Sequence, residues 1–547
     1  MRRTSASPRG SFLVPPPPRR ARGTETTAPA GGTRPSREGA SMGRYRNPIL
    51  PGCHPDPSIC RFGDRYVLVT SSFEYLPGLP VHVSDDLVNW TLAGHVLHRP
   101  GQIDLSGLTS SSGTYAPTVR EVNGRLVVVC TVVGPEEGDW AGRTGHFLVT
   151  ADAPEGPWSD PVWIDGVGGF DPSITVDGDR VWLCGTREAV EGYWPGRTEV
   201  WVAELDLASG ALLSAPVVIW TGAAVGAVWA EGPHLLPHPD GGWMLLVAEG
   251  GTDLEHAVCV AYADRIEGPY VGDAGNPRLS HRDLGPVAPI VAVGHADLVD
   301  DIEGRSWATV LALHPVDGRR GILGRRTSLV PVGWADGRPL FAPGIGRVEE
   351  VVTAESVPDQ RPWPTRVEER FTTERLDLEW NGAGRLPEEI ATWGTDGLLL
   401  PGGAEPSRTA RVSFLGRRLP DENSEASLRL RITPADDGFR AGVLLRVSDA
   451  QQLELSVTGA GEAIAVLAGA EIGRLPLGRD AVGDELELTV RIRNLTASLF
   501  VGEEEVAFCE LDVLAPQPPR GFIGAWVGPV AVGSGEARIT RFALSVG

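Results

Sequence analysis

Three short motifs each place a carboxylate next to a proline or a glycine, and together they could carry out acid–base chemistry. The three motifs are Asp56 in HPDPS (54–58), Asp171 in GFDPS (169–173) and Glu231 in AEGPH (230–234). Hydrolysis of a glycosidic bond needs one carboxylic acid to protonate the leaving oxygen and a second carboxylate to activate water or attack the sugar. A third carboxylate can orient the first two and keep the pKa of the acid high.

The acid motifs belong to a longer internal repeat. Between residues 46 and 351, five units begin with a motif of this kind, and the two without an acid start with Tyr115 in YAPTV and His295 in GHADL. Each unit continues through a tight turn, mostly Asp-Gly or Asn-Gly, into an apolar strand, which is typical of a β-hairpin. A period of about 60 residues fits a four-stranded blade. Five units therefore predict a five-bladed β-propeller.

The propeller explains how acids far apart in sequence could meet. The innermost strands of a propeller converge on its axis, so residues at one equivalent position in different blades point at a shared spot. We expect Asp56, Asp171 and Glu231 to occupy that position in blades one, three and four, with His295 in blade five. A single Asp before proline is more often a turn residue or strand cap. Three carboxylates in register repel one another, and such a cluster is typical of a functional site.

The pattern changes after about Pro362. Residues 426–432 and 486–492 alternate apolar and polar side chains, which predicts an antiparallel β-sandwich. The sequence therefore indicates an all-β chain of four segments: a disordered Pro/Arg-rich tail (1–42), a propeller (43–356), a Pro-rich linker (357–364) and a concanavalin-like sandwich (365–547).

Composition excludes several classes of function. The formal net charge of −22 disfavours nucleic acid as a partner. The chain contains no lysine, which excludes a Walker-type phosphate loop and a Schiff-base mechanism. No run of about 18 apolar residues is present, so no membrane span is expected. The six cysteines form no C-x-x-C pair and are expected to be buried thiols in a reducing compartment, with the cytoplasm as the default location. The sequence leaves open whether the chain forms a homo-oligomer.

The acid motifs, together with NPIL at residues 47–50, resemble glycoside hydrolase family 43. Within that family the chain is most similar to the β-xylosidases that carry a C-terminal β-sandwich. The resemblance implies a five-bladed propeller and inversion of the anomeric centre. It also implies that Asp56 is the general base, Glu231 the general acid and Asp171 the residue that tunes the pKa of the acid and orients it.

The same resemblance implies a set of sugar contacts. These are Phe73 as an apolar wall, Tyr115 in the pocket, His295 beneath the sugar, Arg325 on hydroxyls and carboxylates, and Trp526 over the mouth of the site. For Trp526, a place in the sandwich core is an equal alternative. Three residues depart from the family pattern: Tyr115 stands where Trp is usual, Thr118 where His is usual, and Arg326 where Glu is usual. All three are expected to touch the pocket and to affect sugar specificity.

No cofactor is required for this chemistry, but family resemblance suggests an ion at the propeller axis near His295. One histidine is a weak ligand set for Zn²⁺ and could join the shell of a hydrated Ca²⁺. A hydrogen-bonded buried histidine is the alternative.

The expected activity is exo-acting release of xylose from β-1,4-xylo-oligosaccharides. An α-L-arabinofuranosidase is the first alternative, because xylopyranose and arabinofuranose present similar hydroxyls. A non-catalytic carbohydrate-binding propeller is an alternative from another class. A purely structural propeller would leave the registered acids unexplained.

Overall fold

Strands and tight turns make up nearly all the regular structure. The computed structural model describes residues 42–135, 140, 142–190, 194–285, 287–406, 412–517 and 521–547. In these ranges the only helices are three single 3₁₀ turns: η1 (Pro387–Glu389), η2 (Arg479–Ala481) and η3 (Asp512–Leu514). The predicted tail lies outside the described residues except for Met42, which instead begins strand β1.

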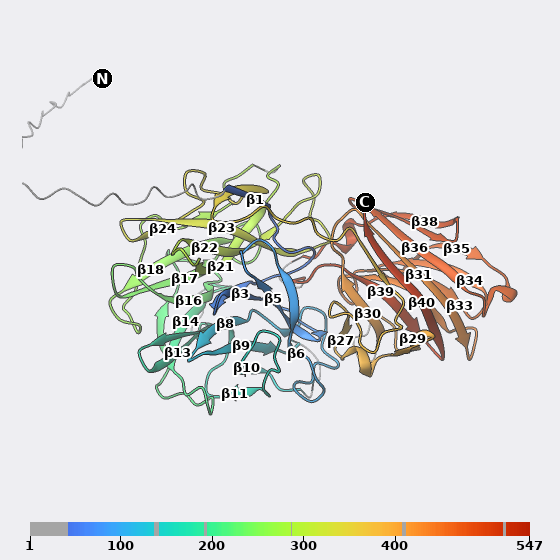
Figure 1. The fold of residues 1–547 in the computed structure, drawn as a ribbon, viewed down its shortest axis with the longest axis horizontal. Coiled ribbons are helices and arrows are strands. Elements are labelled where there is room, and N and C mark those ends of the chain that lie inside the picture. The colour runs from blue at the N-terminus through green and yellow to red at the C-terminus, as the bar shows by residue number, and fades with distance from the viewer. Residues whose placement is uncertain are drawn as a thin grey trace, which may run out of the picture. The chain divides into compact units, whose positions relative to one another are not determined.

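Five antiparallel sheets form the blades of a propeller, coloured from blue to yellow along the chain (Figure 1). Blade I contains β2 (Ser58–Phe62), β3 (Arg65–Val69), β5 (Gly78–Ser84) and β6 (Thr91–Leu97). Blade II contains β7 (Gly113–Thr114), β8 (Thr118–Val122), β9 (Arg125–Val133), β10 (Gly145–Ala151) and β11 (Val162–Ile164). Blade III contains β12 (Phe170–Asp177), β13 (Arg180–Glu188), β14 (Thr198–Glu204) and β15 (Val217–Trp220). Blade IV contains β16 (Glu231–Pro237), β17 (Trp243–Glu249), β18 (Ala257–Ala263), β19 (Val271–Gly272) and β20 (Leu279–Ser280). Blade V contains β21 (Val291–Asp300), β22 (Ser306–Leu313), β23 (Arg325–Ala335) and β24 (Arg338–Phe341).

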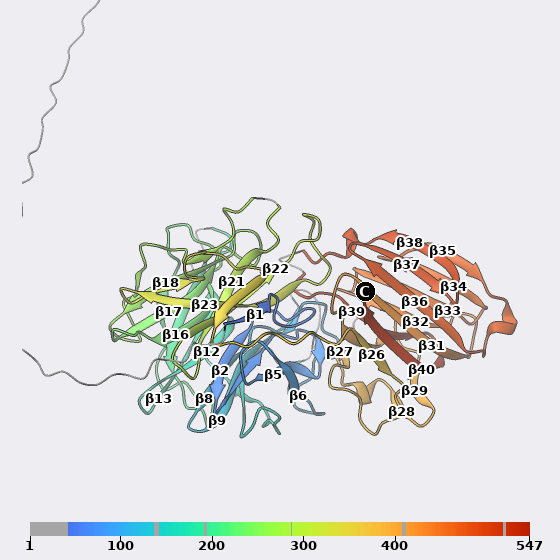
Figure 2. The same cartoon turned by 45° about the horizontal axis from the view of Figure 1, so that its top comes forward.

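The innermost strands close a ring, as the propeller prediction requires. Strand β2 contacts β8 and β21, β12 contacts β8 and β16, and β16 contacts β21. Strands β16, β17 and β18 of blade IV lie side by side in Figure 1 and in Figure 2. The turns follow the sequence signal: Asn123 and Gly124 both have a positive φ, 53° and 78°, as a two-residue hairpin turn requires.

The N-terminal segment fastens the first blade to the last. Strand β1 (Met42–Arg46) pairs with β25 (Val351–Glu355), which follows blade V. The Asn47 side chain then forms hydrogen bonds with both backbone groups of Leu329. It accepts from the Leu329 N–H at 2.8 Å and donates to the Leu329 carbonyl at 3.0 Å. One buried side chain therefore takes the role of a missing strand partner at this junction.

Two eight-stranded sheets form the sandwich that follows, and except for the blue β4 their strands are coloured from yellow-orange to red in Figure 1. The first contains β26 (Arg366–Glu369), β28 (Thr392–Gly394), β29 (Gly397–Pro401), β31 (Ser424–Pro434), β36 (Leu486–Arg493), β37 (Thr496–Val501), β38 (Glu504–Glu510) and β40 (Gly535–Val546). The second contains β4 (Tyr75–Leu76), β27 (Asn381–Ala383), β30 (Ser413–Arg418), β32 (Arg440–Arg446), β33 (Gln452–Thr458), β34 (Glu462–Leu467), β35 (Ala470–Pro476) and β39 (Trp526–Val532). Buried aliphatic side chains from both sheets share one core, as period-two alternation predicts.

One strand of the second sheet comes from the propeller. Strand β4 lies between β3 and β5 of blade I in sequence, yet it pairs with β27, with Leu76 opposite Gly382 and Tyr75 opposite Ala383. The segment of blade I that carries Phe73 is therefore continued by an edge strand of the sandwich sheet.

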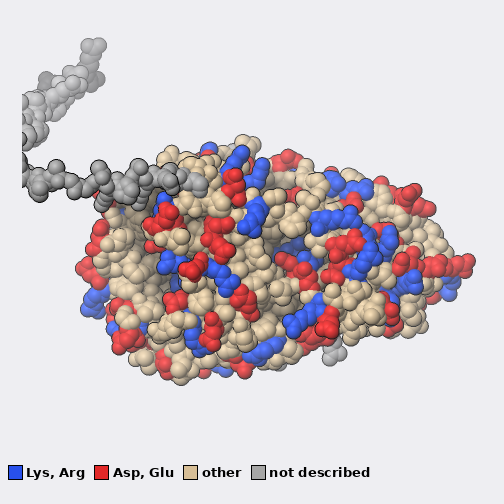
Figure 3. Space-filling view, viewed as in Figure 1, with Lys and Arg blue, Asp and Glu red and all other residues tan. Residues whose placement is uncertain are grey.

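The structure also bears on the cysteines, the surface charges and the length of the helices. All six cysteines are free and buried, as predicted. Acidic and arginine side chains are interspersed over the face shown in Figure 3. Within the described ranges, no helix has the length and apolar character needed to cross a membrane.

Candidate active site

Two of the three acid motifs, those of Asp171 and Glu231, lie at a β-bulge of the innermost strand, and the GHADL motif of blade V has the same bulge. Phe170 pairs with Thr186, but Ser173 pairs with Cys184, so β12 carries one extra residue at this point. The same shift occurs in β16 between Glu231 and His234, and in β21 between Gly294 and Asp297. Bulges of this kind redirect side chains and are common beside active sites.

The bulge shows that one part of the predicted register is wrong. Asp56, Asp171 and His295 share a left-handed backbone, with φ of 53°, 51° and 45°. In blade IV the residue with that conformation is Gly232, with φ of 58°, so Glu231 lies one position earlier than the other acids.

Packing at the axis explains the offset of Glu231. A Cβ placed on Gly232 would lie 2.8 Å from Cε1 of His295, so the imidazole lies directly against the glycine backbone. No side chain fits there without displacing His295. The acid of blade IV therefore comes from the preceding residue.

Asp56 is buried and held in its ionised form. Arg325 donates from Nη1 to Oδ1 at 2.8 Å and from Nη2 to Oδ2 at 3.2 Å, and Ser71 donates to Oδ2 at 2.6 Å. Burial by itself would raise the pKa of Asp56, but Arg325, His295 and the Ser71 hydroxyl outweigh it and lower the pKa below its usual value. An ionised carboxylate is what a general base requires.

The other two acids are shifted in the opposite direction. Burial raises the pKa of Asp171 to about 6, although the Gly232 N–H donates to its Oδ2 at 3.1 Å. Burial, followed by the negative charges of Asp171 and Asp56, raises the pKa of Glu231 well above its ordinary value. The two pKa shifts thus run in opposite directions: one favours the ionised form of Asp56 and the other the protonated form of Glu231, which are the forms that a general base and a general acid need.

Three aromatic rings form a wall next to Arg325. Phe73 and Tyr115 meet edge to face with ring centroids 5.3 Å apart, and Phe522 stacks on Phe73 at 6.1 Å. The guanidinium carbon of Arg325 lies 5.6 Å from the ring of Phe73 and 5.1 Å from that of Phe522. The structure thus brings together the predicted residues Phe73, Tyr115 and Arg325.

Phe522, from the sandwich, is the functional residue that the sequence did not single out. Besides its ring contacts, its backbone carbonyl accepts a hydrogen bond from Nε of Arg325 at 3.0 Å. The signal for it was present, because Phe522 lies in the same segment as Trp526. An aromatic in an irregular stretch could not be assigned to the site without its tertiary neighbours.

Trp526 does not lie over the mouth of the site, and that expectation is corrected. Its side chain is 1% exposed and belongs to a core cluster. Its ring stacks on Tyr75 with centroids 4.0 Å apart, and the guanidinium carbon of Arg418 lies 4.4 Å from it. Trp526 is therefore buried, as the alternative held, but it packs where the sandwich meets Tyr75 of the propeller and not within the sandwich core.

Arg326 does not face the pocket either. Arg325 and Arg326 are neighbours on β23, so their side chains point to opposite sides of the strand. Arg326 donates from Nη2 to Oε2 of Glu422 in the sandwich at 2.8 Å, and both side chains are about one-tenth exposed. This departure from the family pattern is therefore an ion pair with the sandwich and not a change in the sugar pocket.

The surroundings of His295 do not fit a metal held by protein side chains. Its Nδ1 lies 3.9 Å from Oδ1 of Asp56, but that carboxylate is already engaged by the guanidinium of Arg325. Among the described residues, no group of three or more His, Cys, Asp or Glu side chains could hold an ion. A mostly hydrated Ca²⁺ beside His295 stays a prediction.

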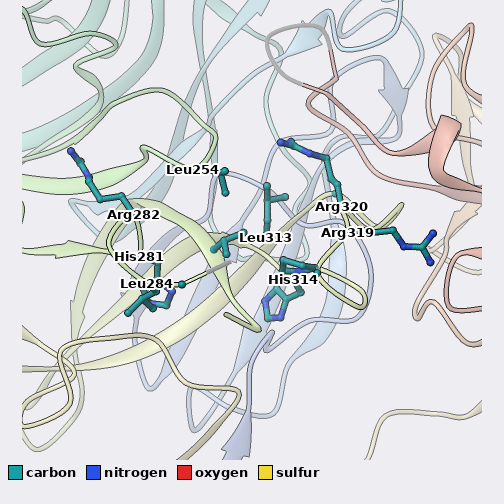
Figure 4. Close-up of a pocket in the computed structure, with 14 residues that line it drawn as sticks. Leu254, His281, Arg282, Leu284, Leu313, His314, Arg319 and Arg320 are labelled. Carbon is teal, nitrogen blue, oxygen red and sulfur yellow. The ribbon is translucent and has the colours of Figure 1, made fainter. Parts of the chain in front are cut away.

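A separate cavity opens between the loops of blades IV and V. It has a volume of about 320 Å³ and is lined by residues that include Leu254, His281, Arg282, Leu284, His314 and Arg320 (Figure 4). Asp56, Asp171 and Glu231 do not line it. Gly324 is one of its lining residues, so the cavity comes within one residue of Arg325.

The arrangement defines a class of protein. A buried carboxylate whose pKa is lowered by arginine, a second carboxyl whose pKa is raised by burial and by neighbouring carboxylates, and an aromatic wall are the parts expected of a glycoside hydrolase. The sequence matches the family described as glycosyl hydrolases family 43 over residues 45–339, and a β-xylosidase C-terminal concanavalin A-like domain over residues 368–543. The chain belongs to glycoside hydrolase family 43.

Individual relatives cover nearly the whole chain. A xylosidase/arabinosidase of Butyrivibrio fibrisolvens is 36% identical over 510 residues, covering 90% of this chain and 96% of the relative. A non-reducing end α-L-arabinofuranosidase of Bacteroides ovatus is 34% identical over 512 residues, covering 90% of this chain and 92% of the relative. Among solved structures, a xylan β-1,4-xylosidase of Bacillus halodurans is 28% identical with a TM-score of 0.83, covering 92% of this chain and all of that one.

Proposed function

We propose that this chain is an inverting, exo-acting β-xylosidase that releases xylose from β-1,4-xylo-oligosaccharides. The observation that carries the proposal is the opposite direction of two pKa shifts in one buried site. Arg325 lowers the pKa of Asp56, whereas burial and then the charge of Asp171 raise the pKa of Glu231. Two carboxylates whose pKa values are driven apart divide the roles of base and acid between them.

In the proposed reaction, the Glu231 carboxyl gives its proton to the glycosidic oxygen as the bond to the anomeric carbon breaks. The Asp56 carboxylate takes a proton from a water molecule that attacks the opposite face of that carbon. Asp171 keeps the pKa of Glu231 high through its charge. The products are a free sugar of inverted configuration and a shortened alcohol.

The enclosed character of the site supports exo action. The side chains of Asp56 and Asp171 are buried, and Phe73, Tyr115 and Phe522 close one side. Such a pocket suits a terminal sugar better than the interior of a polymer. The names of the relatives support both xylosides and arabinosides, so α-L-arabinofuranosidase activity is the second candidate.

The test compares an aryl β-D-xyloside with an aryl α-L-arabinofuranoside on the purified chain. We expect the higher kcat/KM on the xyloside, and a clear preference for the arabinofuranoside would reverse the order of the two candidates. NMR of the first-formed sugar should show α-xylose from the β-xyloside. Appearance of β-xylose first would overturn the inverting mechanism and the role of Asp56. A chain that binds xylo-oligosaccharides but cleaves neither substrate would be a carbohydrate-binding propeller.

A further inference from the structure

A single buried arginine of the sandwich joins two propeller segments that border the site. Arg446 is the last residue of β32, and its side chain has no exposed surface. It donates from Nη1 to Oε1 of Glu74 at 2.9 Å and to the hydroxyl of Tyr75 at 2.7 Å. It donates from Nη2 to Oγ of Ser110 at 2.8 Å and to Oδ1 of Asp449 at 2.8 Å. The guanidinium therefore fastens residues 73–76 and 110–114 to the sandwich.

The first segment carries Phe73 into the aromatic wall. Glu74 follows Phe73 directly, and its carboxylate is buried. Phe73 itself has a left-handed backbone, with φ of 51°, and exchanges two backbone hydrogen bonds with Thr114 at 3.0 and 3.1 Å. A bulky residue in that conformation is strained and persists only where its surroundings hold it. The ion pair of Glu74 with Arg446 lies one residue from this strained position.

The second segment leads to Arg325. Glu74 accepts from the Ser111 N–H at 3.2 Å, and the Ser111 hydroxyl accepts from the Phe522 N–H at 3.1 Å. The Phe522 carbonyl accepts from Nε of Arg325 at 3.0 Å. Arg325 in turn binds Asp56 through two hydrogen bonds. A continuous series of hydrogen bonds thus runs from the sandwich arginine to the carboxylate of the base.

Burial of this ion pair is costly, which argues that its geometry matters. Burial raises the pKa of Glu74 above its usual value even though Arg446 lowers it. Removing a charged pair from water costs several kcal/mol per ion, and apolar replacements are often no less stable. A fixed arrangement of the groups around the pair is a benefit that apolar packing would not supply.

We propose that Arg446 is a positioning residue of the hydrolytic site, setting the Phe73 segment and the Phe522 carbonyl so that Arg325 stays aligned on Asp56. The inference rests on the proposed glycosidase activity. It predicts that the sandwich contributes to the kinetics of the site and not only to the stability of the chain. Two measurements separate these roles. The first is how far a variant changes KM and kcat individually, and the second is whether the acid limb of the pH profile moves.

The decisive variant is Arg446→Met, which keeps the length of the side chain and removes its donors. With an aryl β-xyloside we expect kcat/KM to fall by about 10–100-fold, since misplacement of positioned groups has costs of this order. We also expect the acid limb of kcat/KM to move to higher pH, because a poorly held Arg325 lowers the pKa of Asp56 less. Arg446→Lys should recover part of the loss.

Arg440→Met is the matched control. Arg440 lies on the same strand and is ion-paired with Glu454 and Glu405, at 2.7 and 2.6 Å, all within the sandwich. The Arg440→Met variant should have a lower melting temperature but an unchanged KM and an unchanged pH profile. If Arg446→Met behaves in the same way, with only Tm changed, Arg446 is a stabilising residue and the inference fails.

If Arg446→Met does not fold, a milder variant tests the same inference. Ser111→Ala removes only the hydroxyl that accepts from the Phe522 N–H. It should shift the acid limb in the same direction by a smaller amount, and an unchanged profile would overturn the inference. Inactivity of the unmodified chain on all aryl glycosides would instead count against the proposed function.

Discussion

Arg325 binds both carboxylate oxygens of Asp56, with Nη1 to Oδ1 at 2.8 Å and Nη2 to Oδ2 at 3.2 Å. This pair sets the protonation state of the base, because Arg325 is the strongest of the groups that lower the pKa of Asp56. The guanidinium is itself fixed by the Phe522 carbonyl. A buried carboxylate of the propeller is thus linked, through Arg325, to a backbone group of the sandwich.

Arg325→Met tests the electrostatic role of this pair. Without the guanidinium, burial would dominate and the pKa of Asp56 would rise. The base is active only when ionised, so activity would be lost at a higher pH as the solution is acidified. We expect the acid limb of the kcat/KM profile to move upward and kcat/KM to fall by about 100-fold or more at neutral pH. An unmoved acid limb would show that Asp56 is not the group that titrates there.

Glu231→Gln tests the general acid. Glutamine cannot donate a proton to the leaving oxygen, so hydrolysis of xylobiose should fall by about 10²–10⁴-fold. Aryl glycosides with good leaving groups need little protonation, so their hydrolysis should fall less. The basic limb of the pH profile should also disappear, since that limb follows deprotonation of Glu231. Equal losses on both substrates would contradict the role of acid.

Asp171→Asn tests how the acid is kept protonated. Asp171 is the first of the two charges that raise the pKa of Glu231. The amide removes that charge, so the pKa of Glu231 should fall and the basic limb should move to lower pH. The pH dependence of kcat/KM on an aryl xyloside measures the shift. Movement of the limb to higher pH would mean that Asp171 does not act on Glu231 through its charge.

The raised pKa of Glu231 also has a consequence for stability. A carboxyl group whose pKa is higher in the folded state binds its proton more tightly there, so stability is lost as the pH rises from the unfolded pKa through the folded one. Glu231→Gln removes this loss. The variant should melt above the unmodified chain, by a margin that grows as the pH rises above the ordinary carboxyl pKa of about 4.5. Calorimetry over this range would show a constant margin if Glu231 were ionised throughout.

Phe522→Ala and Trp526→Ala separate the two aromatics of one segment. Phe522 faces Phe73 and Tyr115, so its truncation should raise KM for an aryl xyloside with little change in Tm. Trp526 is buried against Tyr75, so its truncation should cost about 3–5 kcal/mol of the free energy of unfolding. The reverse pattern would restore Trp526 as the sugar contact. Denaturant unfolding and steady-state kinetics on both variants supply the measurements.

Much of the architecture could be read from local signals. The repeated motifs with their Asp-Gly and Asn-Gly turns predicted five blades, because a two-residue hairpin needs residues that accept a positive φ. The period-two alternation at 426–432 predicted the sandwich, since only one face of each of its strands is buried. The acids Asp56, Asp171 and Glu231 were found from the same repeats, because their motifs begin the innermost strands.

Only the tertiary structure decided which side chains surround those acids. The position of Glu231 depended on a bulge and on His295 packing against Gly232, neither of which leaves a periodic signal. Phe522, and not the predicted Trp526, lies in the aromatic wall, because two aromatics four residues apart can be told apart only by what packs on them. The sequence alone therefore determined the blades and their acids, through local turn chemistry and strand alternation. The contacts between sandwich and propeller arise between residues hundreds of positions apart, and the folded chain alone sets them.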